Sequence, residues 1–177
     1  MIRILRNVDF RDIRKGYTML KKIVFILCLM FLPVTMAEAY PNEPNGYASL
    51  YWGEDISQVQ QSYETSFLQY TDMGAEYLVT IPDAKGELGM LGRVYIVCCF
   101  DSTSSLRGIT IYIPRMEYEV ESTFKDSIRD IAATCGAPVI RNGAALWFGK
   151  RTIMAVAKKP ETVIIDLWQT SHIGSLR

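Results

Sequence analysis

The last part of the chain reads as three short strands joined by tight turns, and this pattern constrains the fold more than any other feature. The strands are AALWF, TIMAVA and TVIIDLWQT, at residues 144–148, 152–157 and 162–170. Each is rich in β-branched or aromatic residues, and the turns between them contain glycine or proline. Parallel neighbours would need a crossover of about a dozen residues or more, so these strands must pair antiparallel.

Three more strands are predicted earlier in the chain. Residues 93–100 and 106–113 form a hairpin around the turn-rich segment DSTSS, and residues 75–81 form a strand that Pro82 ends. The loop after Pro82 contains three glycines but neither G-x-G-x-x-G nor G-K-[ST]. This favours a plain connection over a phosphate-binding loop.

Two amphipathic helices are also predicted. The stronger spans about residues 119–135 and is ended by Gly136 and Pro138. One face of it is apolar and comprises Val120, Phe124, Ile128, Ile131 and Cys135. The weaker helix begins at Asp55, which forms a capping-box pattern with Gln58. Its apolar face comprises Ile56, Val59, Tyr63 and Phe67.

The order of these elements is helix, three strands, helix, three strands. It predicts an α+β fold in which an antiparallel sheet of about six strands carries two amphipathic helices on one face. The recurrence of one helix with three strands suggests an internal duplication.

A secretory signal peptide precedes the predicted domain. Lys21 and Lys22 form a short basic region, and the apolar run IVFILCLMFL follows at residues 23–32. Ala37 and Ala39 have the A-x-A spacing of a cleavage site, so cleavage is predicted after Ala39, with Ala37 as the alternative. The apolar run is shorter than the roughly 20 residues of a membrane span. We therefore expect an exported protein, periplasmic or extracellular, with no stable membrane anchor after cleavage.

Residues 1–18 stand before Met19, either as a long basic region of the signal or as sequence upstream of the true start. Lys15 and Gly16 require purine-rich codons at the position of a ribosome-binding site, which favours Met19. The predicted organisation has four parts: an upstream extension and signal peptide at 1–39, a flexible lead-in at 40–49, a single α+β domain at 50–171 and a frayed tail at 172–177.

The charge of the mature chain excludes some partners. Removing 39 residues from 177 leaves 138, and these contain 12 basic and 16 acidic residues, a net charge of −4. A mildly acidic chain without a basic stripe is not expected to bind nucleic acid or anionic lipid.

The mature chain contains three cysteines. Strand alternation places Cys98 on an apolar face, and Cys135 lies on the apolar face of the second helix, so Cys98 and Cys135 are the candidates for a disulfide. Two buried reduced thiols are the alternative. Cys99, on the more polar face of its strand, is the candidate free thiol.

No catalytic, cofactor-binding or metal-binding residues are predicted, and no cofactor is expected. The only histidine is His172, near the end of the chain, and no nucleophile elbow, H-E-x-x-H or EF-hand pattern is present. Asp126 and Asp130 could in principle form an acid–base pair, but acids four residues apart on a helix more often face solvent.

Three tryptophans, Trp52, Trp147 and Trp168, are the candidates for a recognition surface, since aromatic anchors often dominate binding. Their alternative role is core packing. Trp168 alternates with Asp166 and Ile164 and is the one expected to be partly exposed.

The segments WGEDISQV and IAATCGAPV…ALWFG are similar to small exported bacterial domains that open with W-G-x-[ST/D]-x-x-x-V and carry a helix ending in G-x-P. The chain also resembles the helix-and-sheet modules of the β-lactamase-inhibitor-like group. The resemblance implies a helix-plus-sheet architecture and no particular mechanism. We therefore expect a non-catalytic binding or interaction module for a protein, peptide or envelope component, with a small exported hydrolase or thiol enzyme as the alternative.

Overall fold

The computed structural model describes residues 40–81 and 94–171, and it confirms an α+β architecture built mainly from antiparallel strands. Along the chain the elements are β1 (Gly46–Tyr47), β2 (Leu50–Tyr51), α2 (Ile56–Ser62), β3 (Glu64–Thr71), β4 (Gly74–Thr80), β5 (Tyr95–Phe100), β6 (Leu106–Pro114), α3 (Glu117–Cys135), β7 (Val139–Arg141), β8 (Ala144–Phe148), β9 (Thr152–Lys159) and β10 (Thr162–Gln169).

Eight of these strands form one sheet in the order β3-β4-β5-β6-β10-β9-β8-β7, and every neighbouring pair is antiparallel. The six predicted strands are all present, but the predicted strand count is too low. β3 and β7 add one strand at each end of the sheet, and β1 pairs with β2 in a separate two-stranded ribbon.

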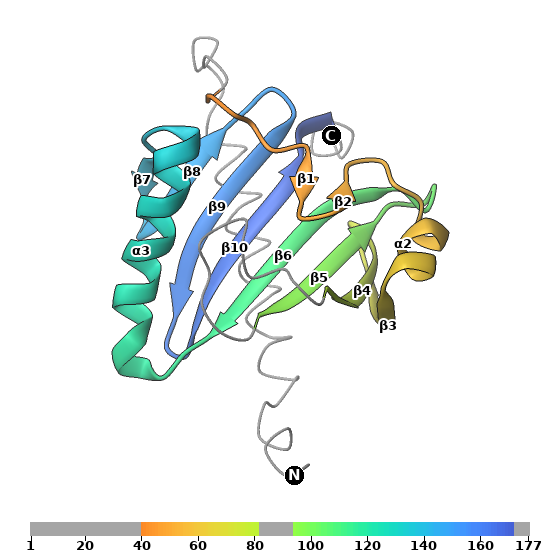
Figure 1. Cartoon of the computed structure of the whole chain (residues 1–177), viewed down its shortest axis with the longest axis horizontal. Helices are drawn as coiled ribbons and strands as arrows, with labels where there is room; N and C mark the ends of the chain where they lie inside the picture. Colours follow the sequence, from red (N-terminus) through yellow and green to blue (C-terminus); the bar gives the residue numbers. More distant parts are fainter. Residues whose placement is uncertain (1–39, 82–93, 172–177) are drawn as a thin grey trace. The chain divides into compact units, whose positions relative to one another are not determined.

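The sheet has two similar halves (Figure 1). In each half a helix is followed by a meander of four strands, and the two meanders meet where β6 pairs with β10. Each half is therefore a helix with four strands, where the sequence indicated a helix with three.

Helix α3 lies across β9 and β10 (Figure 1). It begins at Glu117, with acidic residues in the first turn that suit the positive end of the helix dipole, and Gly136 caps its end with φ of 81°. The apolar face of α3 is the predicted one, since Val120, Ile131 and Cys135 are buried. They pack on one face of the sheet, the core face, together with inward residues of the central strands, among them Ile109, Ile111, Val163 and Ile165.

Helix α2 differs from its prediction. The Asp55–Gln58 capping box is present, but the helix ends at Ser62, because the backbone of Tyr63 is extended at φ −139°. Phe67 therefore lies on β3 and not on a helix. Only Val59 of α2 is buried, so the prediction of two helices covering one face of the sheet is wrong for α2.

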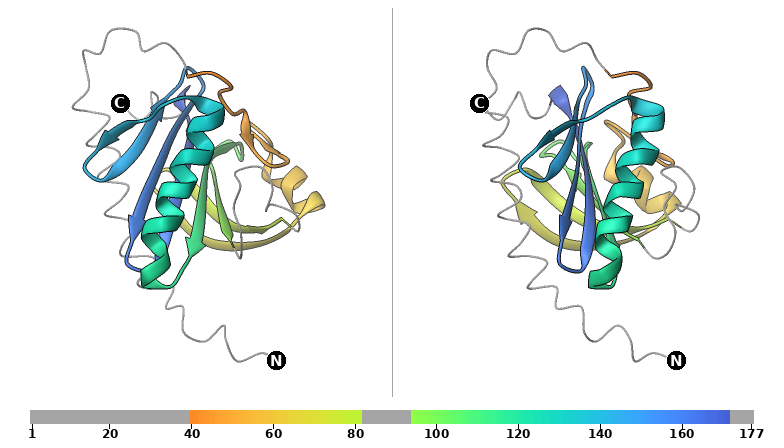
Figure 2. Two further views of the ribbon diagram at one scale, coloured as in Figure 1. Left: turned by 60° about the vertical axis from the view of Figure 1, so that its left-hand side comes forward. Right: turned by 90° about the vertical axis from the view of Figure 1, so that its left-hand side faces the viewer.

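The segment before α2, residues 40–54, is here called the N-terminal strap. It covers part of the core face, and in Figure 2 its β1–β2 ribbon lies on the same side of the sheet as α3. Tyr47 and Leu50 are buried in the core, and the Tyr40 hydroxyl donates a hydrogen bond of 3.1 Å to the Thr152 carbonyl. Residues 40–49, predicted to be a flexible lead-in, are thus packed against the domain.

The predicted signal peptide, the loop at 82–93 and the tail from His172 lie outside the described residues. Within residues 40–81 and 94–171, neither helix has the length and apolar character needed to cross a membrane.

Candidate functional site

Trp168 is buried and does not form the predicted recognition surface. It lies directly across from Gly108 on the neighbouring strand, and a Cβ atom at Gly108 would come within 2.6 Å of the indole ring. The ring therefore lies against the β6 backbone at Gly108, which has no side chain to prevent the contact. Only 7% of Trp168 is exposed.

The other two tryptophans also serve packing. The Trp147 indole donates a hydrogen bond of 2.8 Å to the Gly136 carbonyl, which ties β8 to the end of α3. Trp52 is half-buried, and its indole donates to the Thr152 hydroxyl at 2.8 Å. Each of these two indole N–H groups thus has a partner inside the domain.

The structure does not form the predicted disulfide between Cys98 and Cys135, and none of the three cysteines that it describes is in a disulfide. Cys135 adjoins Gly136, which bonds to Trp147 on β8, whereas Cys98 lies on β5. Helix α3 packs on β9 and β10, and β6 lies between β10 and β5, so Cys135 and Cys98 belong to different parts of the core.

The thiols are also poor nucleophiles. Burial raises the pKa of Cys98 and of Cys135, which keeps both protonated. Cys99 forms no disulfide and is buried on the other face of the sheet, whereas the sequence indicated an accessible thiol. A reactive cysteine requires a lowered pKa and access to solvent, so these environments disfavour the thiol-enzyme alternative.

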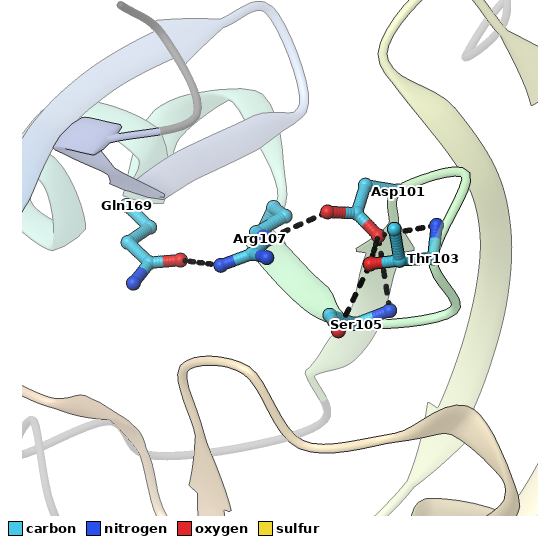
Figure 3. Close-up of polar contacts among 5 residues, drawn as sticks. All are labelled: Asp101, Thr103, Ser105, Arg107 and Gln169. Carbon is cyan, nitrogen blue, oxygen red and sulfur yellow. Dashed lines mark hydrogen bonds and ion pairs between the residues drawn. The ribbon is translucent and has the colours of Figure 1, made fainter. Parts of the chain in front are cut away.

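A polar cluster organises the β5–β6 turn (Figure 3). The Asp101 carboxylate accepts hydrogen bonds from the backbone N–H groups of Thr103 and Ser105. It also forms an ion pair with the Arg107 guanidinium at 2.7 Å. Arg107 in turn donates to the Gln169 side chain at 2.5 Å, which links the turn to the end of β10. These groups satisfy one another, so the cluster braces the turn.

The helical acids behave as a solvated face. Arg129 contacts Asp126 at 2.8 Å and Asp130 at 3.3 Å on the outer side of α3. In the part of the chain that the structure describes, no group of three or more potential metal ligands comes together.

The most distinctive surface feature is a row of aromatic rings that runs from the core to the β3 edge of the sheet. Phe67 and Tyr77 are direct cross-strand partners with ring centroids 5.4 Å apart, and Tyr77 meets Phe100 edge-to-face at 5.7 Å. Phe67 also meets Tyr70 at 5.0 Å. We call Phe67, Tyr70 and Tyr77 the aromatic edge.

A β-bulge brings two of these rings together. Residues an odd number of positions apart on a regular strand point to opposite faces, which would separate Phe67 from Tyr70. The register of β3 on β4 shifts between Phe67 and Gln69, so the extra residue, Leu68, restores both rings to the same face.

Exposure increases along the row. Phe100 is 1% exposed, Tyr77 is half-buried, Phe67 is 50% exposed and Tyr70 is 80% exposed. The inner ring anchors the outer ones, because each ring packs on its neighbour. Large aromatic groups are thus held in fixed positions at the surface.

Phe67 and Tyr70 of the aromatic edge lie on β3, and Tyr77 lies on its neighbour β4. Among the described strands, β3 is the outermost at one edge of the eight-stranded sheet. It is eight residues long and contains no buried residue. The opposite edge, β7, has three residues, of which Val139 and Ile140 are exposed.

Two exposed carboxylates flank the aromatic edge. Residues 40–81 contain six carboxylates and no basic residue, but Glu43 lies against Arg151 and Thr152 at the start of β9 and Glu76 is buried, so neither adds to the charge exposed at this edge. Glu64 at the start of β3 and Asp72 just after its end are both exposed. The helical spacing of Ile56, Val59, Tyr63 and Phe67 predicts a helix through Phe67, so the sequence did not reveal this site. The β-branched and aromatic composition of ETSFLQYT is nevertheless typical of a strand.

No protein family, no curated protein and no solved structure matches the chain.

Proposed function

We propose that the protein is an exported, non-catalytic binding module that recognises a protein, peptide or envelope component through the aromatic edge. The observation that carries this proposal is the pair of exposed rings, Phe67 and Tyr70, which pack on each other on the edge strand β3, with Phe67 also packed on Tyr77 of β4. Soluble domains rarely leave several adjacent large aromatic groups in water unless these groups bind something.

The chemistry of these rings favours binding. Tyrosine and phenylalanine offer large contact areas at a small cost in side-chain entropy, and a few such residues often provide most of the binding free energy. Here Phe67 and Tyr70 are already held in place by ring contacts, so little further ordering is required on binding.

The test uses the protein expressed as the full chain and purified after export. The immobilised wild type and a Phe67→Ser/Tyr70→Ser variant are exposed to solubilised envelope proteins, and retained species are quantified. The matched control is Val139→Ser/Ile140→Ser, which changes exposed apolar residues at the opposite edge. We expect specific species to be lost with the first variant and kept with the control. Equal retention by all three proteins would refute the proposed function.

Export is part of the same proposal and is tested separately. Expression of the full chain in a bacterium should yield protein outside the cytoplasm whose N-terminus is Tyr40 or Glu38. A product in the membrane that retains residues 1–37 would contradict export with cleavage.

A further inference from the structure

We propose that the ligand of the aromatic edge is an extended, basic polypeptide segment that adds to β3 as a further strand. This inference rests on the proposed function and specifies the partner of the same site. It combines three properties of the edge: its open backbone, its aromatic rings and its negative charge.

The backbone of β3 suits strand addition. An edge strand offers unpaired N–H and C=O groups, and natural edges are usually protected by short length, by proline, by charged side chains (especially lysine) or by bulges. β3 has eight residues and neither proline nor lysine. Its bulge at Leu68 divides the edge, so the regular stretch from Glu64 to Phe67 is where we expect the partner's main-chain hydrogen bonds.

The rings specify side chains on one face of the added strand. Phe67 and Tyr70 point to the same face, so alternate residues of the partner would pack against them. The exposed face of Tyr70 is also suited to a lysine or arginine side chain, because aromatic rings attract cations.

The charge specifies the sign of the partner. The exposed carboxylates of Glu64 and Asp72 flank β3, and β3 itself contains no basic residue. This negative potential attracts a basic segment and opposes an acidic one. It also opposes a second copy of this chain, since pairing β3 with itself would bring two acidic edges together.

The experiment measures fluorescence anisotropy of fluorescein-labelled peptides of about ten residues that alternate in residue type, as added strands do. One peptide alternates lysine with valine, and a second alternates glutamate with valine. In two further lysine–valine peptides every second backbone nitrogen is methylated. One peptide is methylated at the odd-numbered residues and the other at the even-numbered residues, so that each has lost the N–H donors of one of its two edges. N-methylation removes the N–H donors that strand addition requires on the edge facing β3.

We expect the lysine–valine peptide to bind and the glutamate–valine peptide not to bind. One of the two N-methylated peptides should bind about tenfold more weakly or worse, and the other much as the parent does. Phe67→Ser/Tyr70→Ser should weaken binding about tenfold or more, and Val139→Ser/Ile140→Ser should not. Glu64→Gln/Asp72→Asn should weaken it and reduce its dependence on salt, whereas Glu117→Gln, an exposed acid on α3, should change neither.

Each other outcome overturns the inference. Equal binding by both N-methylated peptides would exclude strand addition, and equal binding of the glutamate–valine peptide would exclude charge selection. Sedimentation that finds a dimer disrupted by Phe67→Ser would assign the edge to a second copy of the chain. In all three cases the proposed function still holds if Phe67→Ser/Tyr70→Ser loses the envelope species that the wild type retains. Failure of strand addition can therefore be distinguished from failure of the proposed function.

Discussion

At the scale of single residues, the burial and bonding of a strand side chain depend on the residue opposite it on the neighbouring strand, and this residue cannot be identified from the local sequence. Alternation along β10 correctly placed Ile164, Asp166 and Trp168 on one face. It could not show that Gly108 lies opposite Trp168, or that the Thr110 hydroxyl bonds Asp166 at 2.6 Å. Those pairings depend on register between segments more than fifty residues apart, which short-range patterns do not encode.

The contact between Gly108 and Trp168 predicts a specific sensitivity. Gly108→Ala would place a methyl group 2.6 Å from the indole, so the ring must move, and we expect a loss of about 1–3 kcal/mol in unfolding free energy. Tryptophan fluorescence and urea denaturation measure the two effects. In a Trp168→Leu background the same glycine substitution should cost much less, and an undiminished cost would place the strain elsewhere.

The thiols give a second prediction. Because Cys98, Cys99 and Cys135 form no disulfide and are buried, the native mature protein should resist alkylation, and denaturant without reductant should expose all three thiols. Intact mass after alkylation counts them. A single reactive thiol in denaturant, rising to three after reduction, would show that a disulfide does form.

Asp101 predicts a pH dependence. Burial tends to raise the pKa of Asp101, but hydrogen bonds from Thr103, Arg107 and Ser105 together hold the pKa below its usual value. A carboxylate with a lowered native pKa adds stability above its unfolded pKa, about 3.9, and this contribution is lost as the pH falls below that value. Asp101→Asn should therefore cost about 1–3 kcal/mol at neutral pH and progressively less below about pH 4.

Urea denaturation across that pH range tests the prediction. Asp126→Asn, on the exposed side of α3, is the control and should change stability by no more than about 0.5 kcal/mol. If the loss of unfolding free energy caused by Asp101→Asn did not change with pH, it would not depend on the charge of the Asp101 carboxylate, and the prediction would be wrong.

At the scale of elements, helices and strands with a long, regular sequence pattern are predicted correctly, and those with a short or irregular pattern are not. The five-residue apolar face and the glycine stop predicted α3 within two residues of its start and at its last residue. The periodicity from Ile56 to Phe67 suggested a longer helix, but β3 pairs with β4 over that second half, and tertiary pairing prevails over a marginal helical pattern. A three-residue strand such as β7 carries too little sequence to be detected.

The packing of α3 predicts a graded response. Ile131 is 1% exposed, whereas Ile128 is only half-buried at the edge of the same face. Ile131→Ala should cost about 2–5 kcal/mol because it leaves a cavity, and Ile128→Ala should cost less because solvent fills part of the space. Urea denaturation of both variants checks the order. A larger cost at Ile128 would mean that α3 is rotated relative to the sheet.

At the scale of the whole molecule, the two meanders are local structures joined by distant contacts. Each meander forms from consecutive strands, which is why the antiparallel α+β class was predictable. The seam between β6 and β10 and the docking of the N-terminal strap depend on segments far apart in the chain, and the sequence did not reveal them. The carboxylate of Glu43, for example, accepts hydrogen bonds from the backbone N–H groups of Arg151 and Thr152, 108 and 109 residues away.

Glu43 therefore predicts a kinetic signature. Glu43→Ala would leave two backbone N–H groups without their acceptor, and we expect a loss of about 1–3 kcal/mol in unfolding free energy. If the strap docks after the main transition state, the loss should appear as faster unfolding with an unchanged refolding rate. Stopped-flow chevron plots separate the two rates, and slower refolding would place the strap in the folding nucleus.

The strap's long-range contacts also bear on maturation. Closing a loop of about a hundred residues costs more entropy than closing the turns of a meander, so the first segment of the domain to be synthesised is the last expected to settle. On the proposed export route, the scissile bond adjoins Tyr40, which is buried in the finished domain. Late docking would leave this bond accessible to a peptidase while the sheet is already forming. The released end would then be held beside the last turn of α3, where the exposed Asn42 side chain donates a hydrogen bond to the Thr134 carbonyl.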